Sequence, residues 1–128
     1  MKRLIATTVL ALGLAGAAQA DPALGIWQTQ VDDGSYAHIK MVPCGNAVCG
    51  TIDRTFNSSG EYKSENIGKQ LVRSMVPDGK GNYAGRVWRP SNNKVYIGKM
   101  TVNGDRLKLS GCIAGGLLCS KQTWARVQ

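Results

Sequence analysis

The sequence predicts an all-β fold, a small up-and-down antiparallel β-barrel of seven or eight strands. Short segments that alternate apolar and polar residues recur along the chain, and turn-forming residues separate them. No segment keeps the 3.6-residue periodicity of a long amphipathic helix. Gly50, Gly85, Gly98 and Gly111 interrupt the strands, and such glycines allow a small sheet to coil and close. A β-sandwich of hairpins is the alternative arrangement.

Seven segments carry the expected strands. They are residues 25–30, 35–42, 48–56, 83–90, 94–102, 105–113 and 119–127. Asp33-Gly34 and Asn103-Gly104 are two-residue hairpin signals between such segments. Residues 61–76 are ambiguous, because Gly68 breaks a helical spacing of apolar residues. We expect a loop with one helical turn there, followed by an eighth strand near residues 71–76.

The first 20 residues have the three-part pattern of a secretory signal peptide. Lys2 and Arg3 precede an apolar run over residues 4–16, and an Ala-x-Ala site ends at Ala20. The run is shorter than the roughly 18 residues typical of a membrane-spanning helix, which is the alternative interpretation. We therefore expect cleavage near Ala20. Residues 21–128 would then be a single β-barrel domain in the periplasm or outside the cell.

The chain is basic, with a net charge of +8. Six Lys or Arg side chains face a single acid, Asp105, between positions 86 and 108. Export and the lack of a recognition-helix or RNA-binding motif argue against nucleic acid as a partner. A solvated surface is the simplest interpretation of this charge. The alternatives are a surface for an anionic envelope component or for an acidic protein.

The chain has four cysteines, Cys44, Cys49, Cys112 and Cys119. An even number of cysteines in a small exported domain is typical of a disulfide framework. A turn at Asn46-Ala47 would place the first two opposite each other, and a turn at Gly115-Gly116 would do the same for the last two. We therefore expect two local disulfides. A zinc site built from all four cysteines and a reactive dithiol are the alternatives; the second spacing is long for a zinc knuckle, and no Cys-x-x-Cys motif is present.

Residues at the two ends of the expected barrel predict how it closes. Gly25-Ile26-Trp27 opens the first strand, and Trp124-Ala125-Arg126 ends the last. First and last strands are neighbours in an up-and-down barrel, so Arg126 can lie across Trp27 in a cation–π contact. We expect Gly25, Trp27, Trp124 and Arg126 to form this closure. The layout resembles the lipocalin and calycin superfamily, in which a G-x-W motif meets an arginine of the last strand.

A second resemblance covers residues 24–127. Its most specific part is P-x-N-x-K-x-Y-x-x-K-M-x-x-x-G-D-x-L-x-L-x-G-C-I, from Pro90 to Ile113, and Q-T-W-x-R, from Gln122 to Arg126, supports it. These motifs resemble a family of exported bacterial proteins catalogued as a domain of unknown function, DUF2147. The resemblance implies a small lipocalin-like β-barrel that is periplasmic or secreted, and it supplies no activity. The middle region here is more compact than in that family.

The residues themselves give no pattern of catalytic groups. His38 is the one histidine, and it lies in an alternating strand without a nucleophile motif in the chain. Asp32 and Asp33 are explained as turn formers before Gly34. We therefore expect no catalysis, no metal and no cofactor. Under the least favoured hypothesis, an enzyme, His38 and Asp53 are the residues to mutate.

The favoured function is an exported, non-catalytic barrel that binds a small apolar or envelope ligand. An eight-stranded barrel has room for side chains or for one small ligand. Arg86, Trp88, Tyr96 and Lys99 are the candidate binding residues. The second hypothesis is a protein-binding or inhibitor module of the periplasm, suggested by a small stapled scaffold with a basic face.

Overall fold

The computed structural model describes residues 21–128, and the expected signal peptide, residues 1–20, lies outside the described residues. This part of the chain has nine strands. They are β1 (Gly25–Gln28), β2 (Ser35–Cys44), β3 (Ala47–Asn57), β4 (Gly60–Tyr62), β5 (Gln70–Pro77), β6 (Asn82–Arg89), β7 (Lys94–Asn103), β8 (Arg106–Ile113) and β9 (Leu118–Arg126). A short 3-10 turn, η1 (Ala114–Gly116), is the single helical element between residues 21 and 128. The all-β prediction is confirmed.

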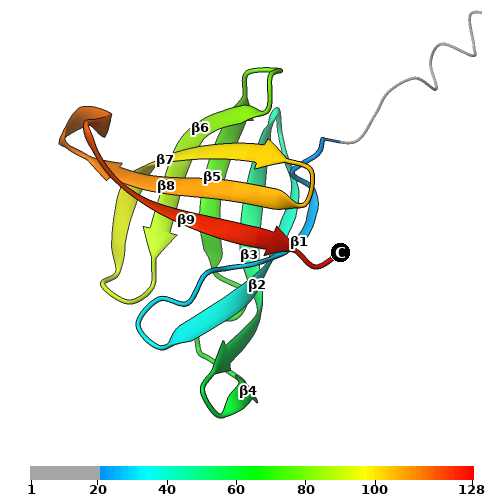
Figure 1. Cartoon of the computed structure of the whole chain (residues 1–128), viewed down its shortest axis with the longest axis vertical. Helices are drawn as coiled ribbons and strands as arrows, with labels where there is room; N and C mark the ends of the chain where they lie inside the picture. Colours follow the sequence, from blue (N-terminus) through cyan, green and yellow to red (C-terminus); the bar gives the residue numbers. More distant parts are fainter. Residues whose placement is uncertain (1–20) are drawn as a thin grey trace, which may run out of the picture.

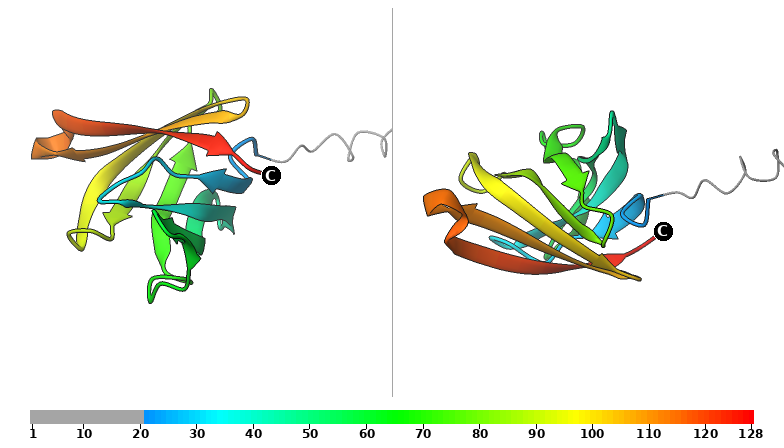
Figure 2. Two further views of the ribbon diagram at one scale, coloured as in Figure 1. Left: turned by 60° about the horizontal axis from the view of Figure 1, so that its bottom comes forward. Right: turned by 90° about the horizontal axis from the view of Figure 1, so that it is seen from above.

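Eight of these strands form a closed antiparallel barrel (Figure 1). The hydrogen-bonded order is β2-β1-β9-β8-β7-β6-β5-β3, and the pairing of β2 with β3 closes the ring. Strand β4 pairs only with β3, as a small flap at one rim. Strand β1 pairs with the last two residues of β9, so the other end of the β8–β9 hairpin extends beyond the barrel wall (Figure 2).

The up-and-down order gives the barrel two different ends. One end, called the closed end here, holds residues 21–24, the turns at 45–46, 78–81 and 104–105, and the C-terminus. The other, called the open end, holds the connections 29–34, 58–69, 90–93 and 114–117. Two connections of the open end, 29–34 and 58–69, are longer than any turn of the closed end, and chain segments that connect strands commonly carry binding sites.

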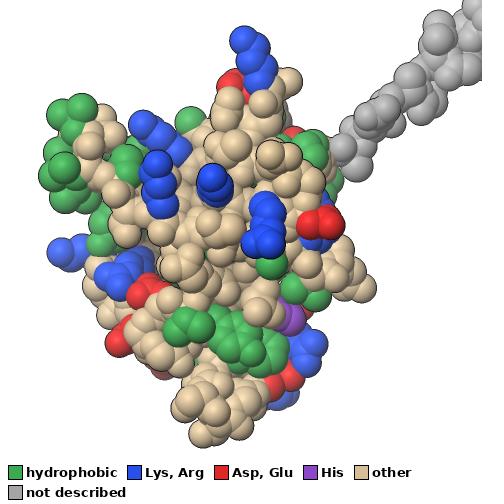
Figure 3. Space-filling model, viewed as in Figure 1, with side chains coloured by type: hydrophobic (Ala, Val, Ile, Leu, Met, Phe, Trp, Pro, Cys, Tyr) green, Lys and Arg blue, Asp and Glu red, His purple; other side chains and the backbone are tan. Residues whose placement is uncertain are grey.

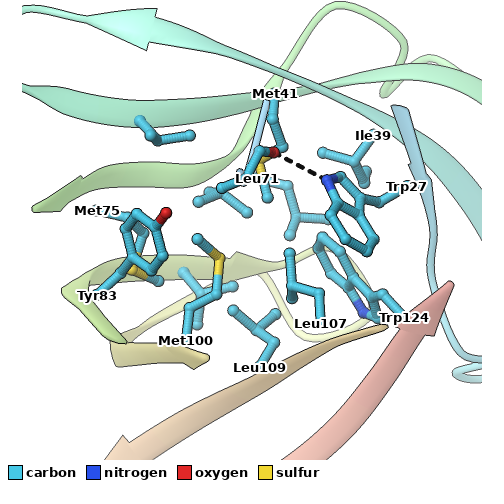
Figure 4. Close-up of a cluster of buried hydrophobic side chains, with 14 of the residues drawn as sticks. Trp27, Ile39, Met41, Leu71, Met75, Tyr83, Met100, Leu107, Leu109 and Trp124 are labelled. Carbon is cyan, nitrogen blue, oxygen red and sulfur yellow. Dashed lines mark hydrogen bonds between the residues drawn. The ribbon is translucent and has the colours of Figure 1, made fainter. Parts of the chain in front are cut away.

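Large apolar side chains fill the barrel interior (Figure 4). Trp27 and Trp124 lie together on one side of this core, while Met75, Tyr83 and Met100 lie together on the other. All five are almost completely buried. Burial of each such side chain contributes about 1.5–3 kcal/mol to folding. This core stabilises the closed half of the barrel. The candidate site lies beside it, toward the open end.

Three local predictions need correction. The segment before β5 contains the short strand β4 and no helical turn. The first cysteine turn is Gly45-Asn46 rather than Asn46-Ala47, so Cys44 faces Ala47 and the disulfide to Cys49 runs diagonally, with a Cα–Cα distance of 5.8 Å. The reason is conformational: Gly45, at the first turn position, has a positive φ of 66°, which favours glycine. The expected strand 25–30 ends at Gln28, two residues early.

The second cysteine pair lies as expected. Cys112 faces Cys119 across β8 and β9, and the S–S distance is 2.09 Å. The Cα–Cα distance of 4.1 Å is close to that of a non-hydrogen-bonded antiparallel pair. The Cys44–Cys49 bond thus braces the closed end, and the Cys112–Cys119 bond braces the open end. We call them the closed-end and open-end disulfides.

Candidate functional site

Arg126 closes one end of the barrel. Trp27 and Arg126 are paired across β1 and β9, and the guanidinium carbon lies 4.3 Å from the centroid of the Trp27 ring. The Nη1 group donates to the Leu24 carbonyl at 2.9 Å, and Nη2 donates to the Pro22 carbonyl at 2.6 Å. The Nε atom lies 3.1 Å from the Asp105 carboxylate. This single side chain therefore ties the N-terminal segment, the last strand and the β7–β8 turn together.

Two further hydrogen bonds seal the closed end. The Trp27 indole donates to the carbonyl of Ala23 at 2.9 Å, and the Tyr83 hydroxyl donates to Asp21. Burial, and then the hydrogen bond to Asp21, raise the pKa of Tyr83. Ala23 and Trp27 are fully buried. The N-terminal residues thus act as a plug, and no ligand can enter from this side without displacing them.

The open end contains a cavity of about 440 Å³. Its buried lining is mainly apolar and comes from strands of the barrel wall. It includes Ile52, Leu71, Val87, Leu109 and Trp124. Its exposed lining is polar, with side chains from the open-end connections such as Gln30, Asp33 and Ser91. The cavity volume lies within the range of small-molecule sites, about 300–1,000 Å³.

An ion pair lies at the mouth of this cavity. The Arg89 side chain makes two hydrogen bonds to Asp32, at 2.8 Å from Nε and 2.7 Å from Nη2. The hydrogen bond from Arg89 holds the pKa of Asp32 below its usual value, against the effect of burial. The pair joins the connection 29–34 to the end of β6. It fixes one edge of the mouth and neutralises the charge of one of its two acids.

Hydrogen bonds also order the aromatic groups around the cavity. The Trp124 indole donates to the Gln122 side chain at 2.9 Å, and both residues line the cavity. The Tyr96 hydroxyl accepts from the Asn92 amide at 2.7 Å. These contacts leave an apolar base with polar atoms near the exit, an arrangement that suits a molecule with one apolar and one polar end.

The candidate binding residues divide into two pairs. Trp88 and Tyr96 line the cavity. Arg86 and Lys99 do not, and both are exposed. The predicted binding roles of Arg86 and Lys99 in the cavity therefore need correction. Lys69 and Arg73, which also lie outside the cavity lining, cover the Trp88 ring, with the charged atoms 5.7 and 5.9 Å from its centroid.

His38 and Asp53 lie outside the cavity lining. The His38 Nε2 atom is 3.0 Å from the Gln28 side-chain oxygen, and its ring packs against Phe56 at 4.7 Å between centroids. Burial, and then the charge of Arg54, lower the pKa of His38. Within residues 21–128, no cluster of three metal-ligating side chains occurs.

Sequence reasoning missed the most important features of the mouth. Asp32 and Arg89 are 57 positions apart, and no local signal links them. Gln122 was noted only as part of the Q-T-W-x-R motif, and a single amide in a strand does not indicate a binding role. Trp124 was expected only as a closure residue, whereas it also lines the cavity.

Comparisons with known proteins agree with this architecture. Protein HP1028 from the human pathogen Helicobacter pylori, which belongs to the lipocalin family, has a similar structure with a TM-score of 0.63. The two chains are 16% identical, and the match covers 82% of each, so the likeness concerns the fold. A search of curated proteins gave no match. Within residues 21–128 no helix has the length and apolar character needed to span a membrane. The family described as "Uncharacterized protein conserved in bacteria (DUF2147)" matches residues 25–126, and the chain therefore belongs to that family.

Proposed function

We propose that this protein is an exported, non-catalytic barrel that binds one small amphipathic ligand in the open-end cavity. The observation that carries the proposal is the cavity itself: about 440 Å³, with a buried apolar lining and a polar rim. The apolar part of the ligand lies against Leu71, Leu109 and Trp124. Its polar part lies at the rim beside the Asp32–Arg89 pair.

Export fits this function. Two disulfides are typical of proteins that fold in an oxidising compartment. The basic start and Ala-x-Ala site of residues 1–20 supply the signal for export to the periplasm. A binding barrel in that compartment meets envelope lipids and other small amphiphiles. We therefore propose an envelope-derived amphiphile as the natural ligand.

Native mass spectrometry of protein isolated gently from the periplasm tests the proposal. We expect a bound species of a few hundred daltons, or binding of the amphipathic probe anilinonaphthalene sulfonate with fluorescence enhancement. Absence of both would overturn the proposal.

Gly111→Leu is the variant that locates the ligand. A Cβ atom at Gly111 would lie 3.4 Å from Cβ of Tyr96 and 3.5 Å from Cγ1 of Val87, so a leucine there extends among the cavity-lining residues. We expect probe affinity to fall about tenfold or more, because the leucine occupies the volume of the apolar part. Thr123→Leu, at an exposed position on β9, is the matched control and should bind normally. Equal binding by both variants would place the ligand elsewhere.

A further inference from the structure

An apolar tip projects from the open end of the barrel. It consists of Ile113, Leu117 and Leu118, whose side chains are 54%, 85% and 62% exposed. The tip stands at the far end of the β8–β9 hairpin, away from the barrel wall (Figures 1 and 2). The space-filling view shows it as a cluster of hydrophobic atoms at one extremity of the molecule (Figure 3). Three exposed aliphatic side chains at one point of a small protein are a marker of an interaction site.

The tip is held in one conformation. Ile113 pairs with Leu118 across the hairpin, and the open-end disulfide joins the next residues toward the barrel. The Leu117 amide donates to the Ala114 carbonyl at 3.3 Å and closes the turn. A rigid tip presents its apolar side chains at little further entropic cost on binding.

A basic surface adjoins the tip on the outer face of β7, β8 and β9. Lys99 and Lys121 lie at the tip end of this surface, and Lys108 and Arg106 continue it toward the closed end; all four are exposed. Lys99 and Lys121 flank Ser110 in one cross-strand row, next to the tip. None of the four makes an ion pair with any residue between 21 and 128. Figure 3 shows basic side chains spread over the face that leads away from the tip.

The same strands carry almost no compensating negative charge. Asp105 is the one acid between residues 94 and 126, and it already pairs with Arg126. An apolar point with an uncompensated basic surface beside it matches the interface of an anionic lipid bilayer. There aliphatic side chains enter the acyl boundary, and lysines contact lipid phosphates.

We propose that the apolar tip and the basic surface dock this protein on an anionic membrane. The tip is convex and aliphatic, which suits insertion between lipids better than a fitted contact with a protein pocket. Docking also has a geometric consequence: Ser120 and Gly111, near the tip, line the cavity. The mouth is therefore on the membrane-facing end of the barrel. The proposal does not depend on the cavity holding a ligand.

Vesicle co-sedimentation tests the docking surface with protein isolated from the periplasm, its N-terminus established by mass spectrometry. We expect binding to vesicles that contain phosphatidylglycerol, weak binding to pure phosphatidylcholine, and a loss of affinity as salt rises. Leu117→Ser with Leu118→Ser should weaken binding about tenfold or more, since it removes the apolar anchor. Lys99→Gln and Lys121→Gln should each weaken it about fivefold.

Matched variants control for apolarity and charge elsewhere. Val76→Ser with Val127→Ser removes two exposed apolar side chains at the closed end, and Lys40→Gln with Lys80→Gln removes two exposed charges. These should leave the tip's apolar anchor and basic row intact and affect binding less than about twofold. Equal binding to neutral and anionic vesicles, or equal losses in tip and control variants, would overturn the proposal. Retention on immobilised polyglutamate without vesicle binding would also overturn it and assign the surface to an acidic protein.

Discussion

Replacing Arg126 with methionine tests whether one side chain closes the barrel. The change keeps an apolar stem over Trp27 and removes the guanidinium. The cation–π contact, at 4.3 Å from the ring centroid, contributes about 1 kcal/mol at a partly exposed site. The part-buried hydrogen bond to the Leu24 carbonyl contributes about 2 kcal/mol. The bond to Pro22 is exposed, so water replaces it. The expected loss is about 3 kcal/mol in the free energy of unfolding.

Urea denaturation followed by tryptophan fluorescence measures this loss. For a domain of this size, it corresponds to a fall in Tm of roughly 12–20 °C. Asp105→Asn is the matched control, because it removes only the ion pair. Asp105 is 83% exposed, so its loss should cost less than about 1 kcal/mol. A loss for the Arg126 variant no larger than for the Asp105 variant would show that the closure does not rest on the arginine.

The disulfides, two glycines and the Asp32–Arg89 pair give three other predictions. Replacing both cysteines of either disulfide with alanine should lower the free energy of unfolding by about 2 kcal/mol without abolishing the fold, because each bond closes a short loop. A chelator should have no effect on Tm. Gly25→Ala should destabilise by about 2–4 kcal/mol, since φ is 122° and the new Cβ would overlap the Gln128 carbonyl; Gly104→Ala, where no atom lies within 4 Å, should cost about 1 kcal/mol. Arg89 holds the pKa of Asp32 below its usual value of 3.8. The stability that this pair confers is therefore present above the usual value, and it is lost as the pH falls through the lower pKa of the folded state. NMR titration of the Asp32 carboxyl should show a midpoint that rises in Arg89→Gln, and an unchanged midpoint would contradict the prediction.

The barrel and its closure could be predicted from the sequence because local and end-to-end patterns agree. Alternation along the strands marks the inward positions, and turn residues mark the hairpins. The pairing of Trp27 with Arg126 follows from the adjacency of first and last strands. Such features depend on chain order and on short-range geometry, both of which the sequence contains.

The mouth of the cavity could not be predicted in the same way. Arg86 and Trp88 have the same strand parity, yet one is exposed and the other is covered by Lys69 and Arg73, which come from another part of the chain. The partner of Arg89 lies in a turn far away in sequence. These details depend on tertiary contacts between connections rather than on local pattern.

NMR mapping of a bound amphiphile tests the central claim, a ligand site in the open-end cavity. Titration with the species identified by native mass spectrometry, or with anilinonaphthalene sulfonate, should shift the Trp124 indole N–H and the Gly111 amide, which border the cavity. The Trp27 indole, bonded to Ala23 in the closed end, should remain unperturbed. Shifts concentrated at Trp27 or spread over the outer surface, with Trp124 and Gly111 unchanged, would contradict the account.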